Sequence, residues 1–312
     1  MKKIWKLLAA VTACAAALCL TAAAAETTAS VKVWGTVSPW DGEGIYLKND
    51  DKDDPFHEVV VNLGDAPIVD AVTGQPLEAK DIKEGSTLYA WIGPAATMSL
   101  PPQVSAIVAV SNVPADAAVP EYYEIAGMPE KGENGEASFP VMGGGTLKVT
   151  AKTEYKPWLT RQIVRMEDLV PGTQVLVWKS GETAEKVVVF AYAYEGHLTQ
   201  ATTPELETVV FINAGYGGDM KGIPCKMSAE GSILVPVRVV AEAAGYDVHW
   251  DKDLGAVVGK DGKTVFSVKP GAEVIQTADG EVGIASPCVL EKGVTYLPAG
   301  DLAHCLNLFF VG

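Results

Sequence analysis

The sequence predicts a mainly β protein with an α+β C-terminal domain: two tandem small OB-like β-barrels, then a domain built from two strand-helix-strand repeats. Three observations predict this architecture. The apolar runs are short, rich in β-branched residues and separated by many of the 31 glycines and 19 prolines among 312 residues. One block recurs in the N-terminal two thirds of the chain. A different block, a strand followed by proline and a helix, recurs in the C-terminal third.

Residues 1–25 have the layout of a secretory signal peptide. Three lysines among the first six residues precede an apolar run over Leu7–Thr21, and Ala23–Ala25 offers small residues for cleavage. An alternative is a lipid anchor at Cys14, because Val11–Cys14 resembles a bacterial lipobox, although the apolar run continues beyond it. No later segment has eighteen consecutive apolar residues, so we expect no membrane span.

The chain is strongly acidic, with 24 Lys and Arg against 39 Asp and Glu and a net charge of −15. Cleavage after Ala25 removes three lysines and no acid, which leaves 287 residues with a net charge of −18. Binding to nucleic acid requires clustered basic residues, so the composition argues against it. It also argues against adsorption to anionic lipid.

The N-terminal repeat predicts two modules, over residues 28–113 and 120–198. Asp81–Trp91 recurs 87 residues later as Asp168–Trp178, with Asp, Gly and Trp at matching positions. Each block reads as a turn that leads into a half-buried strand. The other strand-like runs are Val31–Val37, Gly44–Lys48, Glu58–Leu63 and Ala106–Val110 in the first copy, and Ala137–Met142, Thr146–Thr150 and Val187–Tyr194 in the second. About five short strands per copy favour an OB-like barrel, with a split sandwich as the alternative. The Pro- and Ala-rich segment Val113–Pro120 is the expected linker.

The C-terminal repeat predicts two short helices. Pro236 suits a helix start, an apolar face follows, and Gly245 suits a left-handed C-cap. Tyr296–Asn307 repeats this pattern 62 residues later, with Asn307 at the cap. Asp261 and Gly262 predict a hairpin turn between the two copies. The last residues, Leu308–Val311, are expected either to form a closing strand or to leave the sheet short on one side.

The block Leu234–Asp251 resembles the copper amine oxidase N-terminal-like (stalk) domain, a module of secreted proteins in clostridia-like Gram-positive bacteria. The residues that carry the motif are Leu234, Val235, Pro236, Arg238, Ala241, Glu242, Gly245, Val248, Trp250 and Asp251. The resemblance covers about residues 208–312 and implies a structural role for these residues. The second repeat departs from it, because Gly300 stands where the first has Arg238.

The resemblance implies a module without catalysis, because copper amine oxidases carry their chemistry in another, larger domain. The Asn-Tyr dipeptide of their quinone precursor is absent from this sequence. The four histidines, His57, His197, His249 and His304, are scattered, whereas copper requires imidazoles that converge. We therefore expect no enzyme activity and no cofactor. An alternative is a secreted hydrolase whose carboxylate site is not recognised.

Two groups of residues are candidate binding sites. Asp50, Asp51, Asp53 and Asp54 could form a calcium loop, although the EF-hand glycine is missing and a solvated hairpin tip also fits. Trp40 and Trp158 lie beside prolines and could be exposed for stacking on a glycan. The repeated pair Trp91 and Trp178 fits core packing instead.

The cysteines predict little chemistry. Cys225, Cys288 and Cys305 remain after the signal peptide is removed, and this odd number permits at most one internal disulfide. Their spacing does not predict a zinc site, and buried small apolar residues are the expectation.

These observations favour a non-catalytic exported protein, secreted and associated with the cell wall. It would bind cell-wall polymer or scaffold an envelope protein partner. The alternative is a calcium- or metal-dependent extracellular binding protein.

Overall fold

The computed structural model describes residues 30–159, 163–202, 208–214 and 221–312. In these ranges the protein is mainly β, with 26 strands, two short α-helices and two 3-10 helices. None of the helices in these ranges is long and apolar enough to cross a membrane. The expected signal peptide and Cys14 lie outside the described residues.

The first barrel is closed by five strands. Its strands are β1 (Val31–Ser38), β2 (Ile45–Lys48), β3 (Glu58–Asn62), β4 (Ile68–Asp70), β5 (Thr87–Ala96) and β6 (Gln103–Ser111). Antiparallel pairs join β3 to β2, β2 to β1, β1 to β5 and β5 to β6, and a parallel β3–β6 pair closes the circuit. Alternate side chains of each strand face inward, and Val33, Leu47 and Leu88 are among those fully buried there. Strand β4 adds to the outer edge of β6 in parallel.

The second barrel has the same strand order. Its strands are β7 (Glu121–Glu124), β8 (Glu130–Lys131), β9 (Ala137–Pro140), β10 (Thr146–Val149), β11 (Glu154–Pro157), β12 (Gln174–Ser180) and β13 (Thr183–Val189). The path β7-β12-β13-β10-β9 includes a parallel β10–β13 contact, and the bridge between Ile125 and Val141 returns the path to β7. Strand β11 lies parallel to β13, as β4 does to β6. The predicted repeat is therefore visible in how the strands pair.

The repeated Asp-x-x-x-Gly segment has the same conformation in both barrels. The 3-10 helices η1 (Ala79–Asp81) and η2 (Met166–Asp168) each end on the repeated aspartate. The Asp81 carboxylate accepts the backbone N–H of Glu78 at 3.0 Å, and that of Asp168 accepts the N–H of Arg165 at 2.7 Å. Each aspartate thereby satisfies a backbone donor that the short helix leaves free.

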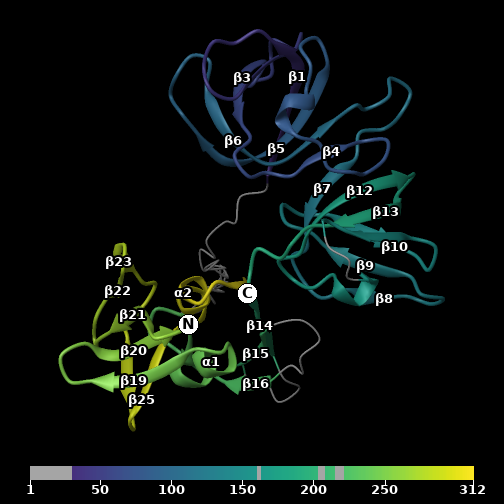
Figure 1. Ribbon diagram of the computed structural model, residues 1–312. Helices are drawn as coiled ribbons and strands as arrows, with labels where there is room; N and C mark the ends of the chain where they lie inside the picture. Colours follow the sequence, from purple (N-terminus) through teal and green to yellow (C-terminus); the bar gives the residue numbers. More distant parts are fainter. Residues whose placement is uncertain (1–29, 160–162, 203–207, 215–220) are drawn as a thin grey trace, which may run out of the picture.

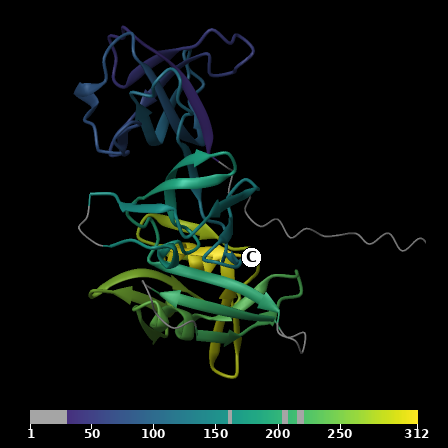
Figure 2. The same cartoon turned by 90° about the vertical axis from the view of Figure 1, so that its right-hand side faces the viewer.

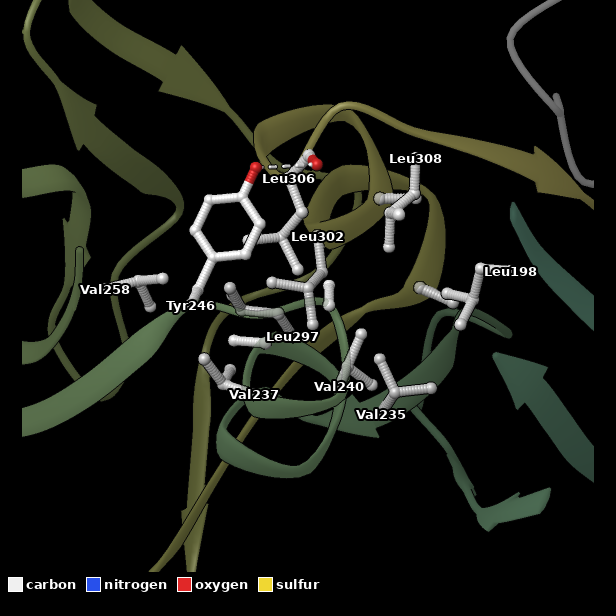
Figure 3. Close-up of a cluster of buried hydrophobic side chains, with 14 of the residues drawn as sticks. Leu198, Val235, Val237, Val240, Tyr246, Val258, Leu297, Leu302, Leu306 and Leu308 are labelled. Carbon is white, nitrogen blue, oxygen red and sulfur yellow. Dashed lines mark hydrogen bonds between the residues drawn. The ribbon is translucent and has the colours of Figure 1, made fainter. Parts of the chain in front are cut away.

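The C-terminal domain combines three sheets with two helices around one core. Its elements are β14 (Gly196–Thr202), β15 (Thr208–Ala214), β16 (Lys221–Pro224), β17 (Lys226–Met227), β18 (Ile233–Pro236), α1 (Val237–Ala243), β19 (Asp247–Asp251), β20 (Gly255–Lys260), β21 (Lys263–Val268), β22 (Val274–Thr277), β23 (Gly280–Gly283), β24 (Val289–Glu291), β25 (Val294–Pro298), α2 (Ala299–Cys305) and β26 (Leu308–Val311). The sheets have the orders β16-β15-β14-β26, β17-β18-β25-β24 and β19-β20-β21-β22-β23. Figure 3 shows Val237 and Val240 of α1 converging with Leu302 of α2 and with Leu198 and Leu297 of the sheets.

The two copies of the C-terminal repeat face each other. Strands β18 and β25 pair antiparallel, and each runs through a proline into its helix. The helices end as expected, because Gly245 and Asn307 both have positive φ, 81° and 51°. Strand β26 closes the edge by pairing parallel with β14, so the expectation that Leu308–Val311 form a closing strand is correct. Strand β14 of this sheet begins at Gly196, two residues before the expected end of the second module at residue 198.

Figures 1 and 2 show the three parts as a row, with the first barrel at one end and the second barrel between it and the C-terminal domain.

Candidate functional site

The two barrels share one buried apolar cluster, which we call the barrel interface. The first barrel contributes Val69, Ala71, Trp91, Val108 and Val110, and the second contributes Tyr122, Trp158, Leu176, Val188 and Phe190. The strand alternation that points Leu88 and Val175 into the barrel cores points their neighbours outward into this interface. The barrels are therefore joined by continuous apolar packing in addition to the linker.

The same repeat positions from both barrels build the barrel interface. Residues 71, 89 and 91 of the first barrel correspond to residues 158, 176 and 178 of the second at the 87-residue offset. All six lie in the cluster or pack against it. The repeated pair Trp91 and Trp178 thus packs between the barrels, which agrees with its assignment to core packing.

Trp178 forms a specific polar contact across the barrel interface. Its indole Nε1–H donates to the carbonyl oxygen of Ala71 at 2.7 Å, which satisfies a partly buried donor. On the second barrel, the Lys186 ammonium lies 3.6 Å from the centroid of the Trp178 ring. Burial and the nearby Lys156 hold the pKa of Lys186 below its usual value.

The expectation of an exposed Trp158 is wrong. Its side chain is only 9% exposed, and its ring packs edge-on against Phe190 at 5.5 Å between centroids. Trp158 follows β11 and belongs to the apolar cluster shared with the first barrel, so its ring is buried in that cluster. It cannot stack on a glycan without separating the barrels.

Trp40 is accessible, as the sequence analysis expects. Its side chain is 39% exposed, its Nε1–H donates to the Glu43 carbonyl at 3.1 Å, and its ring lies 5.3 Å from Tyr46. Trp34, 37% exposed, stacks on Tyr89 at 6.2 Å with an interplanar angle of 18°. The accessible tryptophans of the barrels are thus on the first one, and the expected pair of Trp40 and Trp158 does not form a single platform.

The acidic loop, residues 49–57, connects β2 to β3, and two of its aspartates accept hydrogen bonds from its own backbone. Asp51 accepts the N–H of Asp53 at 3.1 Å, and Asp54 accepts the N–H of Phe56 at 2.8 Å and the side-chain amide of Asn49 at 3.0 Å. These bonds shape a hairpin tip. Within the described residues, no group of three or more His, Cys, Asp or Glu side chains is placed to hold a metal ion. Calcium binding by Asp50, Asp51, Asp53 and Asp54 remains a prediction.

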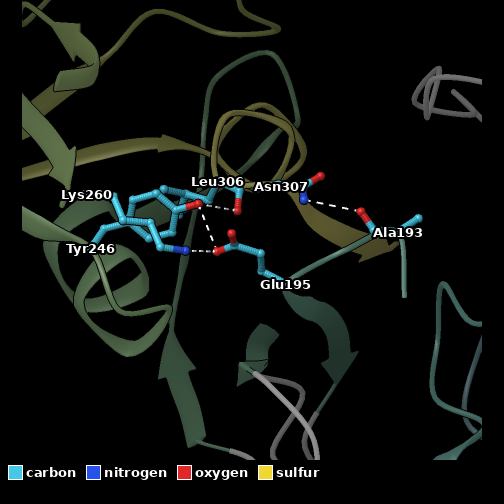
Figure 4. Close-up of polar contacts among 6 residues, drawn as sticks. All are labelled: Ala193, Glu195, Tyr246, Lys260, Leu306 and Asn307. Atoms are coloured by element: carbon cyan, nitrogen blue, oxygen red, sulfur yellow. Dashed lines mark hydrogen bonds and ion pairs between the residues drawn. The ribbon is translucent and has the colours of Figure 1, made fainter. Parts of the chain in front are cut away.

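A second junction joins the C-terminal domain to the second barrel through the segment Ala193–Glu195 (Figure 4). The Glu195 N–H donates to the Asn307 carbonyl at 2.9 Å, and the Asn307 side-chain amide donates to the Ala193 carbonyl at 3.2 Å. The Glu195 carboxylate forms an ion pair with Lys260. The Tyr246 hydroxyl lies 2.9 Å from the Leu306 carbonyl and 3.2 Å from the Glu195 carboxylate, so its proton can go to either acceptor. Burial and the Glu195 charge raise the pKa of Tyr246 to about 12, so this hydroxyl stays protonated.

Aromatic packing reinforces this domain junction. The Tyr194 and Phe309 rings meet edge to face at 5.1 Å. Gly172, the glycine of the repeated block, approaches both rings so closely that a Cβ there would lie 2.8 Å from Tyr194 and 2.9 Å from Phe309. A small crevice beside it is lined by Val170, Pro171, Gly172, Tyr192, Tyr194, Glu195 and Gly196.

Most motif residues of the C-terminal domain have structural roles. Leu234, Val235 and Ala241 are buried, and Pro236 caps α1. The Arg238 guanidinium bonds Glu242 at 3.0 Å and the Val248 carbonyl at 2.5 Å, which ties α1 to β19.

The end of the motif forms the β19–β20 turn. Asp251 accepts two backbone N–H groups, those of Asp253 and Leu254, at 2.7 and 2.9 Å. Trp250 differs from the other large apolar residues of the motif, because it is 51% exposed. At the position equivalent to Arg238, Gly300 faces Phe310, whose ring would lie 3.5 Å from a Cβ.

The cysteines and the buried histidine offer poor reactive groups. Among the described residues, Cys225, Cys288 and Cys305 form no disulfide. Burial raises the pKa of Cys225, and it raises the pKa of Cys288 and Cys305 to about 11, so the thiolate that a nucleophile requires is scarce at neutral pH. His197 of β14 is buried, and burial holds its pKa below the usual value.

Residues 220–309 match the family model of the copper amine oxidase N-terminal domain. The match confirms the resemblance over these residues and extends to neither barrel. It covers the N-terminal domain of that family and no catalytic domain, which is consistent with a non-catalytic module. No curated protein and no solved structure matches the chain.

Two groups of residues that the structure brings forward have no recognisable motif in the sequence. Glu195, Tyr246 and Lys260 come from distant segments, and no motif connects them. Met98 and Leu100, at the turn between β5 and β6, are fully exposed. The missed signal for this turn was charge, because no charged residue occurs from Gly85 to Ala115.

Proposed function

We propose that the chain is a non-catalytic exported scaffold of the cell envelope. Its OB-like barrels and stalk-type domain would hold binding surfaces at fixed positions for cell-wall polymer or an envelope protein. In this proposal residues 1–25 direct export, and the remaining chain stays associated with the cell wall of a clostridia-like Gram-positive bacterium.

The observation that carries the proposal is the coupling of the three parts. The barrels share the apolar barrel interface. The segment Ala193–Glu195 is hydrogen-bonded to Asn307 of the C-terminal domain through both the Ala193 carbonyl and the Glu195 N–H. Interfaces between mobile domains are typically more polar and less continuous. A protein built this way holds its outer surfaces in a fixed geometry, which suits multivalent binding to an extended polymer or assembly.

The test is co-sedimentation of residues 26–312 with purified Gram-positive cell walls, across a salt series and with calcium or EDTA. The proposal expects saturable pelleting, or, when walls alone fail, saturable binding to purified envelope proteins. The same chain screened on wall glycans and peptides should show no turnover. Absence of binding to walls and to envelope proteins would contradict the proposal, and so would catalytic turnover.

The calcium arm separates two ways of binding. The Asp50→Lys/Asp53→Lys variant reverses two charges of the acidic loop and retains both carboxylates that accept its backbone bonds, those of Asp51 and Asp54. If calcium bridges this loop to the wall, pelleting requires calcium and the variant loses it. If the exposed aromatics bind, Trp40→Ala weakens pelleting without calcium dependence.

A further inference from the structure

The β5–β6 turn, residues 97–102, presents two large apolar side chains to solvent. Met98 and Leu100 are both fully exposed, which is unusual for side chains of this size in a folded protein. The equivalent turn between β12 and β13 is short and charged, with Glu182 in an ion pair with Lys148 at 2.6 Å. The barrel itself therefore does not require an apolar turn at this place.

Hydroxyl groups hold this turn in shape. The Thr97 backbone N–H donates to the Gln103 carbonyl at 2.9 Å, and the Gln103 N–H donates to the Thr97 hydroxyl at 2.8 Å. The Ser99 hydroxyl lies 2.6 Å from that of Thr97 and 2.8 Å from the Pro101 carbonyl. A turn already ordered in this way loses little conformational entropy when its apolar side chains enter a partner.

The charges around the turn indicate what kind of partner fits it. Strands β3 and β6 are parallel, with Val60 beside Gln103, so the acidic loop that precedes β3 lies at the same end of the barrel as the apolar turn. The Val60 N–H donates to the Pro102 carbonyl at 2.9 Å, which fixes this proximity. The turn is uncharged, and the carboxylates of the acidic loop lie at the same end of the barrel.

These features favour a protein over a lipid surface. Carboxylates at the same end of the barrel oppose approach to anionic headgroups, and the turn has no Lys or Arg to pair with these headgroups. A single acyl chain anchors a protein to a membrane only marginally, and the side chains of Met98 and Leu100 bury less apolar area than such a chain. A protein pocket encloses side chains more completely, and methionine adapts well to such pockets.

We propose that Met98 and Leu100 insert into an apolar pocket, bordered by basic residues, on a protein partner of the cell envelope. This inference deepens the proposed function and rests on it. Each buried side chain contributes about tenfold to a hundredfold in affinity, so losing both should weaken binding by about a hundredfold or more.

The experiment begins with a photo-crosslinking residue at position 98 of residues 26–312, used to capture proteins from an envelope extract. The captured protein is identified and purified, and its affinity is measured by calorimetry against four forms of the chain. The forms are the wild type, Met98→Ser/Leu100→Ser, the matched control Val72→Ser/Ile163→Ser, and Asp50→Lys/Asp53→Lys. The control removes two other exposed apolar side chains, and equal melting temperatures establish that each variant folds.

The inference expects about a hundredfold or greater loss for Met98→Ser/Leu100→Ser, less than threefold for the control, and about tenfold for the charge reversal. It is overturned if the captured protein binds the first variant like the wild type, or if no envelope protein is captured. Flotation with phosphatidylglycerol or phosphatidylcholine vesicles that depends on Met98 and Leu100 would assign the turn to lipid instead. Self-association that depends on them would assign it to a second copy.

Failure of this inference is distinct from failure of the proposed function. If all four forms pellet with cell walls alike, the scaffold proposal stands and the assignment of the turn is wrong. If the wild type binds neither walls nor envelope proteins, the proposed function itself is wrong.

Discussion

The two barrels follow the same strand order, yet they differ in how their equivalent parts meet the rest of the protein. In the first barrel, the hairpin that follows the repeated block ends in six residues that expose Met98 and Leu100. In the second barrel, the equivalent hairpin ends in a tight turn at Gly181 and Glu182, and the repeated block instead contacts the C-terminal domain.

This difference distinguishes the residues that the two barrels have in common from the residues that are specific to each barrel. The repeated residues, Asp81 and Asp168 at the turns and Trp91 and Trp178 on the strands, build the barrels and join them. The residues that are not repeated give each barrel its own surface. A duplicated module can keep its packing positions while its loops diverge, because loops carry little of the core.

The largest expected effect is on the barrel interface. Trp91→Ala removes a side chain that is 5% exposed, and we expect it to lower the free energy of unfolding by about 3–5 kcal/mol. Trp34→Ala, in the same barrel but on an accessible surface, is the matched control and should change stability far less. Urea denaturation of both variants measures this difference, and equal effects would contradict the barrel interface.

The two copies of the repeated glycine differ strongly in what surrounds them, so the same substitution should affect the two barrels differently. Gly85 and Gly172 have similar φ values, 78° and 84°, so alanine strains the backbone equally at both, by about 1 kcal/mol. A Cβ at residue 85 meets nothing within 4 Å, whereas at residue 172 it collides with Tyr194 and Phe309. We expect Gly172→Ala to cost about 2–4 kcal/mol in total and to loosen the domain junction.

Thermal denaturation gives the stabilities of the two glycine variants, and limited proteolysis near residue 194 reports on the junction. If the segment near residue 194 is equally protected from proteolysis in Gly172→Ala and in Gly85→Ala, the contact of Gly172 with Phe309 does not stabilise the domain junction.

A smaller effect isolates the hydrogen bond across the barrel interface. Trp178→Phe keeps an aromatic ring and leaves the Ala71 carbonyl without the indole N–H that lies 2.7 Å away. We expect a loss of about 1 kcal/mol in unfolding free energy. Ala71→Gly retains the carbonyl. If only the hydrogen bond matters, the loss of unfolding free energy in the double variant Ala71→Gly/Trp178→Phe equals the sum of the losses in the two single variants. A loss as large as that of Trp91→Ala would show that ring packing dominates at both positions.

The smallest effect depends on pH and belongs to the first barrel alone. Burial by itself would raise the pKa of Asp70, but hydrogen bonds from the Asn112 side chain, from Thr73 and from the Val72 backbone outweigh it and hold that pKa below 3.8. Residue 157, the equivalent position in the second barrel, is proline.

A folded-state pKa below the unfolded value stabilises the protein above the unfolded pKa, and this stabilisation is lost as the pH falls through the folded one. Asp70→Asn should therefore melt below the wild type at pH 6, with the gap closing as the pH falls below 3.8. Melting curves from pH 6 to pH 2.5 measure the gap, and a constant gap would contradict this role for Asp70.

Much of the fold could be predicted from the sequence because its signals are local. The offset of 87 residues marks the two barrels, and the proline-helix-cap pattern places α1 and α2 within about one residue. The barrel interface was less accessible to prediction. Trp158 follows a strand beside a proline, a pattern that also fits an exposed turn, and only the docking of the second barrel on the first buries it.

The domain junction could not be predicted for a similar reason. Glu195, Tyr246 and Lys260 lie far apart in the sequence, so the chain has to fold before they meet. The acidic loop was recognisable, but its backbone hydrogen bonds depend on the exact turn. The apolar turn at residues 97–102 left a signal in the absence of charge, which becomes informative only when the exposure of Met98 and Leu100 is known.

We infer that the repeated tryptophans lock the two barrels into one unit that presents its other surfaces in fixed positions. Differential scanning calorimetry of residues 26–312, with Trp178→Ala as the comparison, tests it most directly. We expect the two barrels of the wild type to unfold in one cooperative transition, and we expect Trp178→Ala to split this transition into two. Separate barrel transitions in the wild type, unchanged in the variant, would contradict it.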